Sequence, residues 1–262
     1  MPCSGFKTLM SGPPAYAART GWPPLLAVLA TVVIGALSLF GAVATMAALA
    51  PNGLPDRPAE GAAADEEWLV LAGQLVSQGL VVALTLIAAQ WIGSSRRSAL
   101  ALAWPAGGVC VILAGLVVVV LVTGAFSIVA LVTRPQDVLA DLAPLWTIMR
   151  SENALLLWII AAIGAPASEE ILFRGFLLSA LAQSRLGFVG ATLVTNVVWT
   201  ALHAGYSLTG LVDVFMFGLV ASWLLWRTGS LWVPIIAHAV YNGTLLAVLS
   251  QYPVPELRAL AS

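Results

Sequence analysis

The sequence contains very few charged residues. Lysine, arginine, aspartate and glutamate make up only 9% of its 262 residues, whereas 60% of the residues are hydrophobic. Because soluble domains carry about 25% charged residues, this composition excludes an ordinary soluble protein. The hydrophobic residues lie in long uncharged runs, which are typical of membrane-spanning helices. The sequence therefore predicts a multi-pass integral membrane protein.

Net charge and cysteine content exclude two further classes of protein. The chain has 11 basic and 12 acidic residues, so it lacks the basic excess that nucleic-acid binding requires. We therefore expect no nucleic-acid partner. The two cysteines, Cys3 and Cys110, are too few for a disulfide framework or a cysteine-rich zinc site. We interpret both as packing or incidental residues.

Several well-known catalytic signatures are also missing from the sequence. It has no His-Glu-x-x-His zinc helix and no Gly-x-Ser-x-Gly nucleophile turn. A single isolated aspartate within the hydrophobic runs does not make an aspartyl-protease pair. The phosphate-binding pattern Gly-x-x-x-x-Gly-Lys is absent as well, which argues against ATP-driven transport by this chain alone.

Hydrophobic residues form seven blocks along the chain, at 24–50, 68–93, 107–133, 153–184, 187–205, 209–226 and 231–250. The more polar connection 134–152 is predicted to be an interfacial amphipathic helix. The block at 153–184 is longer than the roughly 20 residues that one span needs, and Gly164 and Pro166 could divide it. We therefore expect an all-α bundle of about seven to eight membrane-spanning helices.

The distribution of basic residues predicts an orientation in the membrane. Basic residues favour the cytoplasmic side, and a cytoplasmic N-terminus places six of them inside (Lys7, Arg19, Arg96, Arg97, Arg185 and Arg227) and four outside (Arg57, Arg134, Arg150 and Arg258). Nine of the twelve acidic residues then lie in the outside connections. The composition, rich in alanine, leucine, valine and glycine, suggests a bacterial plasma membrane.

Polar and charged residues inside the hydrophobic blocks mark where chemistry could occur, because one charge at the bilayer centre costs about 2.5–3.5 kcal/mol. The residues in question are Glu169, Glu170, Arg174, Asp213 and the only two histidines, His203 and His238. Asp213 stands near the start of its block and is interpreted as a solvated or interfacial acid. Gln74 and Gln78, four residues apart, are expected to hydrogen-bond a neighbouring helix.

The first polar cluster contains two adjacent glutamates. Glu170 and Arg174 are four residues apart and share a helical face, so they are predicted to form an ion pair. Glu169 is turned about 100° away and lacks that partner, which makes it the candidate general base. Pro166 is predicted to bend the helix just before these acids. A break there would bring them close to a helix N-terminus, which favours negative charge.

Two more polar clusters follow on later blocks. Asn196, Trp199 and His203 have the spacing of one helical face, and His238 and Asn242 are four residues apart on another. Three polar faces on three hydrophobic helices suggest one shared polar cavity. Such a cavity would hold water for hydrolysis while the surrounding helices exclude lipid.

Two chemical interpretations fit these residues equally well. In the first, Glu169 and His203 activate a water molecule, and His238 and Asn242 stabilise the oxyanion that forms on the substrate carbonyl. In the second, Glu169, His203 and His238 hold zinc or another divalent metal with one position open for water. The sequence does not decide between the metal-free and the metal-dependent mechanism.

The three clusters, in this order, resemble the motifs of the CPBP family of CAAX proteases and bacteriocin-processing enzymes, also called the ABI family, to which the eukaryotic protease Rce belongs. The matching residues are Glu169-Glu170-x-x-x-Arg174, Trp199-x-x-x-His203 and His238-x-x-x-Asn242. The flanking segments 173–175 and 227–232 agree, and the resemblance covers about 153–246. Trp199 departs from the family, which usually has phenylalanine there.

This resemblance implies an intramembrane endopeptidase in which Glu169 and His203 activate water and His238 and Asn242 stabilise the oxyanion or bind a metal. Its expected partners are the lipid bilayer and a membrane protein or lipid-modified peptide as substrate. The implied division of the chain is a cytoplasmic tail (1–23), N-terminal helices with three spans and an interfacial segment (24–152), a catalytic core (153–250) and a C-terminal tail (251–262).

Two non-proteolytic functions are the alternatives. The first is a membrane scaffold, such as an immunity or sorting partner, that keeps the fold without catalysis. The second is a secondary transporter that uses the same polar cavity. Transporters of this kind are commonly built from repeated halves, and the sequence shows no internal repeat.

Overall fold

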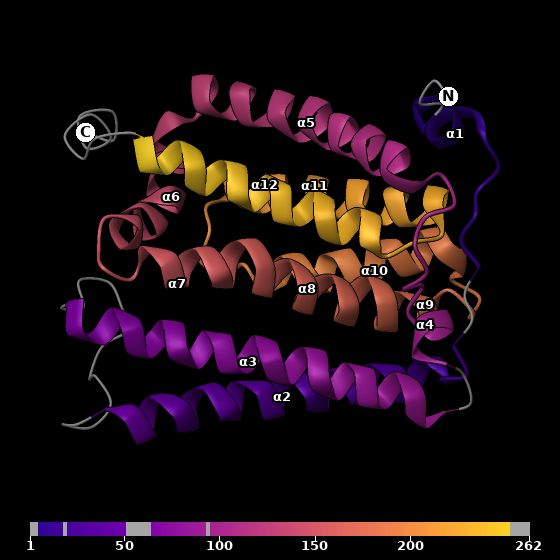
Figure 1. Ribbon diagram of the computed structural model, residues 1–262, viewed down its shortest axis with the longest axis horizontal. Helices are drawn as coiled ribbons and strands as arrows, with labels where there is room; N and C mark the ends of the chain where they lie inside the picture. The colour runs from indigo at the N-terminus through magenta and orange to yellow at the C-terminus, as the bar shows by residue number, and fades with distance from the viewer. Residues whose placement is uncertain (1–4, 18–19, 51–63, 93–94, 252–262) are drawn as a thin grey trace.

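A computed structural model describes residues 5–17, 20–50, 64–92 and 95–251. Within these ranges every regular element is a helix, and the long helices pack side by side in one bundle (Figure 1). The long helices are α2 (Pro24–Leu49), α3 (Ala64–Trp91), α5 (Gly108–Thr133), α11 (Leu208–Thr228) and α12 (Trp232–Gln251). The shorter ones are α1 (Gly5–Ser11), α4 (Arg96–Ala99), α6 (Pro135–Met149) and α10 (Gly187–Ala201).

The bundle contains one further long helix that includes five consecutive elements. It runs without interruption from Ala154 to Leu181. Its parts are α7 (Ala154–Ile159), the π-helix η1 (Ile160–Gly164), α8 (Ala165–Glu169), the π-helix η2 (Glu170–Leu177) and α9 (Leu178–Leu181). The predicted break is therefore absent, and the two glutamates lie in mid-helix instead of at a helix N-terminus.

A wider helical turn takes the place of the predicted break at Pro166. Proline has no N–H to donate and crowds the preceding turn of an α-helix, and the π-helical turns of η1 directly precede Ala165 and Pro166. Turns of this kind interrupt α-helices without ending them and are frequent at functional sites. The irregular geometry thus accommodates the proline and re-aims the side chains that follow.

Six helices in the described part of the chain are long and apolar enough to cross a membrane. Their outward faces carry large exposed hydrophobic side chains, such as Leu25 (71% exposed) and Phe40 (72% exposed), as expected of surfaces that contact lipid. The protein is a multi-pass integral membrane protein. Helix α10 has only 15 residues, fewer than the roughly 20 needed to span, so the expected count of seven to eight spans is not confirmed.

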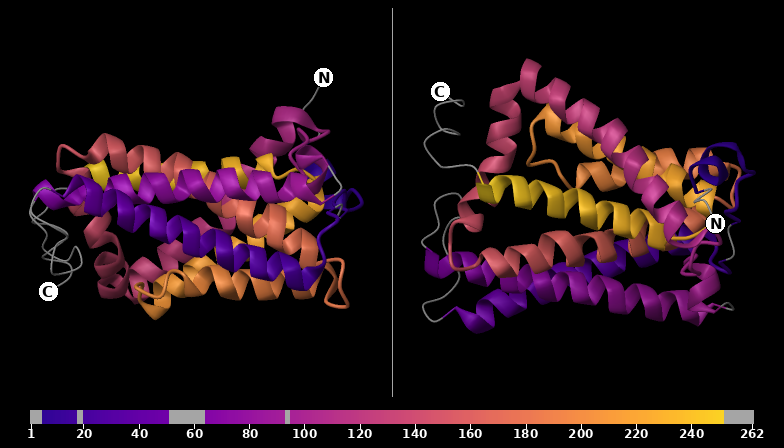
Figure 2. Two further views of the ribbon diagram at one scale, coloured as in Figure 1. Left: turned by 90° about the horizontal axis from the view of Figure 1, so that it is seen from below. Right: turned by 45° about the horizontal axis from the view of Figure 1, so that its top comes forward.

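The bundle has two distinct ends, which we name after their short helices. The α1 end contains α1, α4 and the α9–α10 connection (182–186), and the α6 end contains α6, the α10–α11 connection (202–207) and the C-terminus of α12 (Figures 1 and 2). Helix α6 lies where an interfacial helix was predicted. A single residue, Arg134, separates α5 from α6, and α6 ends shortly before α7.

Contacts between distant segments attach the outer parts of the bundle to its core. The side chain of Gln78 on α3 donates a hydrogen bond to the backbone oxygen of Ile160 (3.2 Å), which confirms the expectation for that glutamine. The N-terminal segment is attached as well. Arg227 Nε of α11 donates a hydrogen bond to the backbone oxygen of Leu9 (2.6 Å), so part of the predicted tail is folded onto the bundle. Cys110 is disulfide-bonded, and its interpretation as a simple packing residue is therefore wrong.

Candidate active site

A buried ion pair lies beneath the predicted site. Arg174 Nη1 is 3.2 Å from Glu170 Oε1, and these side chains are only 1% and 0% exposed. The other guanidinium nitrogen, Nη2, donates to Asn196 Oδ1 (3.3 Å), and Asn196 Nδ2 donates to the backbone oxygen of Phe215 (2.8 Å). The predicted pairing of Glu170 and Arg174 is confirmed. The pair also joins η2 to α10 and α11.

A glycine on α11 makes room for this network. A Cβ atom on Gly218 would collide with the side chains of Asn196 and Arg174. Glycine is therefore the residue that lets α11 approach the buried polar layer closely. Any larger residue at this position would displace the amide and the guanidinium together.

His238 is bound to the same carboxylate as Arg174. Its Nδ1 lies 3.0 Å from Glu170 Oε1, and because the ionised carboxylate can only accept, Nδ1 carries the proton. The second ring nitrogen, Nε2, is then the atom available for chemistry. Since His238 also lines the cavity described below, Glu170 acts as the partner that sets its tautomer and orientation.

Glu169 has a different partner from its neighbour. Trp199 Nε1 donates a 2.7 Å hydrogen bond to Glu169 Oε2. The indole is itself fixed, because it is 2% exposed and the Arg174 guanidinium lies 4.1 Å from the centre of its ring. The sequence identified Trp199 as an aromatic wall but did not identify this hydrogen bond. Only an indole N–H, absent from phenylalanine, can form it.

His203 is held by the backbone of the same tryptophan. Its Nδ1 lies 3.0 Å from the Trp199 carbonyl oxygen, four residues earlier. A carbonyl can only accept, so Nδ1 is protonated and Nε2 is left with its lone pair when the ring is neutral. The residue lies in the turn directly after α10. The short length of α10 therefore places this imidazole beside the cavity instead of within a continuous helix.

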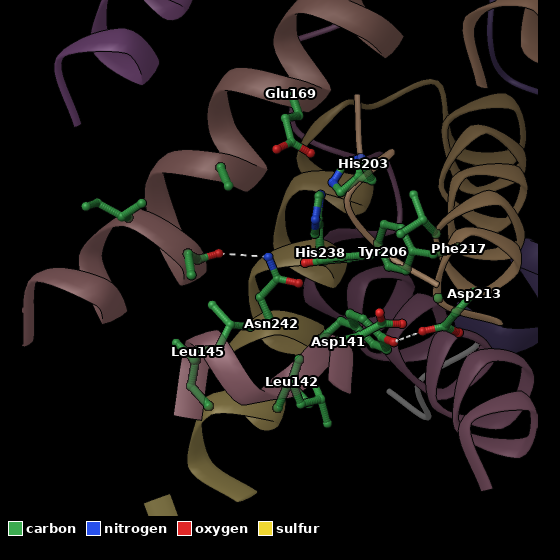
Figure 3. A pocket seen from close by; sticks show the side chains of 18 of the residues that line it. Asp141, Leu142, Leu145, Glu169, His203, Tyr206, Asp213, Phe217, His238 and Asn242 are labelled. Carbon is green, nitrogen blue, oxygen red and sulfur yellow. Dashed lines mark hydrogen bonds between the residues drawn. The ribbon is translucent and has the colours of Figure 1, made fainter. Parts of the chain in front are cut away.

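The three polar faces surround one cavity of about 430 Å³. The carboxylate of Glu169 and the imidazoles of His203 and His238 turn toward the same space (Figure 3). Asn242 also lines the cavity, and one of its Nδ2 hydrogens is used by the backbone oxygen of Ala161 (2.8 Å). The prediction of a shared cavity is confirmed. Glu170, Arg174 and Asn196 form the buried layer behind it.

The opposite wall of the cavity carries groups that the sequence did not identify as site residues. Asp141 of α6 accepts hydrogen bonds from the backbone N–H and the hydroxyl of Ser207 (2.7 and 2.6 Å). Tyr241 donates to Asp213 Oδ2 (2.6 Å). Both aspartates line the cavity, and Asp213 is half-buried there. Its neighbours come from helices distant in sequence, which local spacing cannot show.

Tyr206 lies at the edge of this cavity, in the α10–α11 connection. Burial raises the pKa of its hydroxyl above the ordinary value of 10.0, and the carboxylates of Glu169 and Asp141 raise it further. At physiological pH the hydroxyl is therefore protonated. It can donate a hydrogen bond to a molecule entering the cavity.

The arrangement of donor groups was also tested against the expected metal site. Among the described residues, no group of three or more histidine, cysteine, aspartate or glutamate side chains is placed to hold a metal ion. The predicted ligands Glu169, His203 and His238 therefore do not form a ligand set in this structure.

Comparison with known families identifies this part of the chain. Residues 151–244 match the family model described as "Type II CAAX prenyl endopeptidase Rce1-like". Across this segment the chain is similar to the proteins of that family. The matched segment contains all six predicted site residues, from Glu169 to Asn242, together with Trp199 and Asp213.

Two curated relatives match the chain over shorter stretches. One is the Bacillus subtilis (strain 168) protein named "Putative membrane peptidase YdiL", which is 33% identical over 99 residues, covering 38% of this chain and 39% of the relative. The other is an Escherichia coli protein named "Uncharacterized 24.3 kDa protein", 34% identical over 90 residues, covering 33% of this chain and 41% of the relative. The matches thus span about two fifths of each relative. No solved structure matches the chain.

Proposed function

We propose that this protein is an intramembrane endopeptidase that hydrolyses a peptide bond of a membrane-associated protein or peptide. The observation that carries the proposal is the pair of adjacent glutamates with different surroundings. Glu170 is fully buried and paired with Arg174, whereas Glu169 faces a cavity together with two histidines. The match of residues 151–244 to a family described as endopeptidases supports the same conclusion.

The first chemical step is the activation of water. The Trp199 indole holds one oxygen of the Glu169 carboxylate, and the orientation of His203 leaves Nε2 free to accept a proton. A water molecule placed between these two groups is deprotonated as it attacks the substrate carbonyl carbon. The proton taken from the water is later delivered to the leaving amine, as the carbon–nitrogen bond breaks.

The second step is stabilisation of the negative charge on the carbonyl oxygen. With Nδ1 bound to Glu170, His238 can donate from Nε2 only as an imidazolium cation, and the Glu170 carboxylate stabilises that charged form. Asn242 keeps one Nδ2 hydrogen beyond the one that Ala161 accepts. These two donors, fixed by neighbouring groups, form the oxyanion site. No step in this scheme passes through a metal.

A cleavage assay with purified protein tests the proposal. The wild type and the nearly isosteric Glu169→Gln variant are incubated in detergent with a library of peptides and membrane-anchored proteins, and bound metal is quantified in the same samples. We expect cleavage products from the wild type only, without stoichiometric zinc.

Other outcomes would separate the alternatives. Equal cleavage by both proteins would overturn the role of Glu169. Stoichiometric zinc with activity lost on chelation would favour the metal-dependent mechanism. If neither protein cleaves any substrate while both are folded, and Glu169→Gln leaves the cellular phenotype unchanged, the scaffold function would be favoured.

A further inference from the structure

Helix α6 forms one wall of the cavity, which therefore lies at the α6 end of the bundle. The residues of this helix that line the cavity are Val138, Asp141, Leu142, Leu145 and Ile148. The helix spans 135–149 and so lies before residue 151, where the segment matched by the family model begins. A wall of the cavity, with one of its carboxylates, thus comes from outside the matched segment.

Helix α11 starts with only half of a capping motif of its own. Ser207 is its N-cap residue, and the Ser207 hydroxyl accepts a hydrogen bond from the backbone N–H of Gly210 (3.1 Å). In a complete capping box, a glutamate or glutamine at this third helical position also accepts a hydrogen bond from the N–H of the N-cap residue. Gly210 has no side chain and cannot do so.

Asp141 of α6 supplies the missing acceptor from another helix. Its Oδ1 accepts a hydrogen bond from the Ser207 backbone N–H (2.7 Å), and its Oδ2 accepts one from the Ser207 hydroxyl (2.6 Å). A Cβ atom on Gly210 would collide with this carboxylate, so the glycine leaves the space that the contact needs. The carboxylate also lies at the N-terminus of α11, where the helix dipole favours negative charge.

The α10–α11 connection depends on this contact, because it packs little against the rest of the protein. Residues 202–206 are exposed, except for the half-buried His203. Within the connection, the backbone N–H of Tyr206 donates to the carbonyl oxygen of His203 (2.9 Å), and Ser207 follows directly in the chain. Asp141 is therefore linked to the backbone of His203 through two consecutive residues.

We propose that Asp141 is a positioning residue for catalysis, which holds the α10–α11 connection so that the His203 imidazole keeps its place beside the cavity. The inference rests on the proteolytic function proposed above, in which His203 takes part in activating water. It gives α6 a role in the reaction, although this helix lies outside the matched segment. Because a misplacement of about 1 Å can cost about 10²-fold in rate, loss of the contact should appear in kcat.

Asp137 provides a matched control on the same helix. It lies one turn before Asp141, and its Oδ2 accepts a 2.6 Å hydrogen bond from the Thr209 hydroxyl. This bond also joins α6 to α11, but it reaches the first turn of α11 beyond the connection. Asp137→Ala should therefore weaken the attachment of α6 without releasing His203.

The hold on the connection is tested without reference to activity. Hydrogen–deuterium exchange is measured by mass spectrometry on the full chain in detergent, for the wild type, Asp141→Ala and Asp137→Ala. We expect faster exchange at 202–207 in Asp141→Ala only, with exchange in α12 unchanged. Exchange at 202–207 equal to that of the wild type would overturn the proposal. Faster exchange throughout the chain would also overturn it, since Asp141 would then support the whole fold.

Kinetics on substrates that the wild type cleaves test the consequence for catalysis. In Asp141→Ala, kcat should fall by about 10- to 100-fold with KM changed by less than about threefold, whereas Asp137→Ala should keep kcat within about threefold of the wild type. In the background of His203→Ala, Asp141→Ala should lower the residual kcat by less than about twofold, because its effect passes through the imidazole. Equal losses from the two aspartates, or an undiminished further loss without the imidazole, would overturn the proposal.

A second variant and the wild type separate the remaining outcomes. Asp141→Asn keeps one acceptor oxygen and should show the same pattern with a smaller loss, so it replaces Asp141→Ala if that protein does not fold. If the wild type cleaves no substrate while exchange follows the expected pattern, the proteolytic function is overturned and the hold of α6 on the connection is supported. If the wild type and both Asp141 variants cleave equally well, the proteolytic function stands and the positioning role is wrong.

Discussion

The site consists of two layers that use the same residue types for different purposes. In the cavity layer, Glu169 and His203 are half-buried and keep free polar atoms toward the cavity. In the buried layer, Glu170 and Arg174 are almost completely enclosed and bonded to one another. Two glutamates adjacent in sequence thus differ in function because Glu170 is paired with Arg174 one turn along the same helix, whereas Glu169 accepts an indole N–H from Trp199 of α10. The position of a residue relative to the cavity, more than its type, determines whether it takes part in catalysis or supports the structure.

The two layers are joined at two points. Glu170 binds His238, which lines the cavity, and the Arg174 guanidinium lies over the ring of Trp199, which binds Glu169. A change in the buried layer should therefore affect stability first and activity as a consequence. A change in the cavity layer should affect activity alone. The following substitutions test this difference.

The largest effect on activity is expected from Glu169→Gln. The amide keeps the size of the side chain but cannot accept a proton from water, so kcat should fall by about 10²- to 10⁴-fold. The midpoint of thermal unfolding in detergent should stay close to that of the wild type. If the midpoint of thermal unfolding also fell strongly, Glu169 would belong with the buried layer, which would contradict the comparison of the two layers.

The largest effect on stability is expected from Arg174→Met. This substitution leaves the fully buried Glu170 carboxylate without its main counter-charge, and breaking a buried pair in this way costs about 3–5 kcal/mol. Thermal unfolding monitored by circular dichroism measures the loss. The double variant Glu170→Gln/Arg174→Met removes both charges and should be more stable than Arg174→Met. An equally unstable double variant would show that packing, and not the unpaired charge, causes the loss.

An intermediate effect is expected from Trp199→Phe, which keeps an aromatic ring but removes the indole N–H. The ring remains over Arg174, but the hydrogen bond to Glu169 is lost. Since hydrogen bonds to charged groups contribute about 1.5–3 kcal/mol, kcat should fall by roughly tenfold or more while KM and thermal stability change little.

Two comparisons make this prediction specific. Trp199→Leu, which also removes the aromatic ring, should lose stability as well as activity. In the background of Glu169→Gln, Trp199→Phe should cause little further loss of kcat, because its effect depends on the carboxylate. Independent, additive losses would show that Trp199 acts by another route.

The smallest effect is expected from Gln78→Leu, on the wall of the cavity that α3 forms. The substitution removes one hydrogen bond between α3 and η1, and such bonds between membrane helices contribute about 0.6 kcal/mol on average. The variant Gln74→Leu on the same helix serves as the control. Both proteins should keep wild-type kcat and an unfolding free energy within about 1 kcal/mol of the wild type. A strong loss of activity would extend the functional region to α3.

Much of this organisation could be predicted from local patterns. Long uncharged runs predicted the positions of the main helices to within a few residues, because the bilayer accepts only segments that satisfy their own backbone hydrogen bonds. The spacing of four residues predicted the pair of Glu170 and Arg174. Spacing also grouped Asn196, Trp199 and His203 on one face. These relations lie within single helices, where sequence distance determines spatial distance.

Other features depend on contacts between helices and could not be predicted. The hydrogen bond between His238 and Glu170 joins residues 68 positions apart, and the hydrogen bond from Ser207 to Asp141 joins residues 66 positions apart. The hydrogen bond from Trp199 to Glu169 joins two helices across 30 positions. The expected zinc ligands had suitable side chains, but their positions in the bundle do not form a ligand set.

The sequence by itself determined that this chain lies in a membrane, where its long helices lie, and which few polar residues face one another inside. These properties follow from hydrophobicity and from the period of a single helix. Only the tertiary structure decided which groups Glu169 and His238 bind, which imidazole nitrogen is available, and at which end the cavity lies. Those choices depend on how separate helices pack, because a polar group in an apolar bundle takes its role from the partner that the neighbouring helix provides.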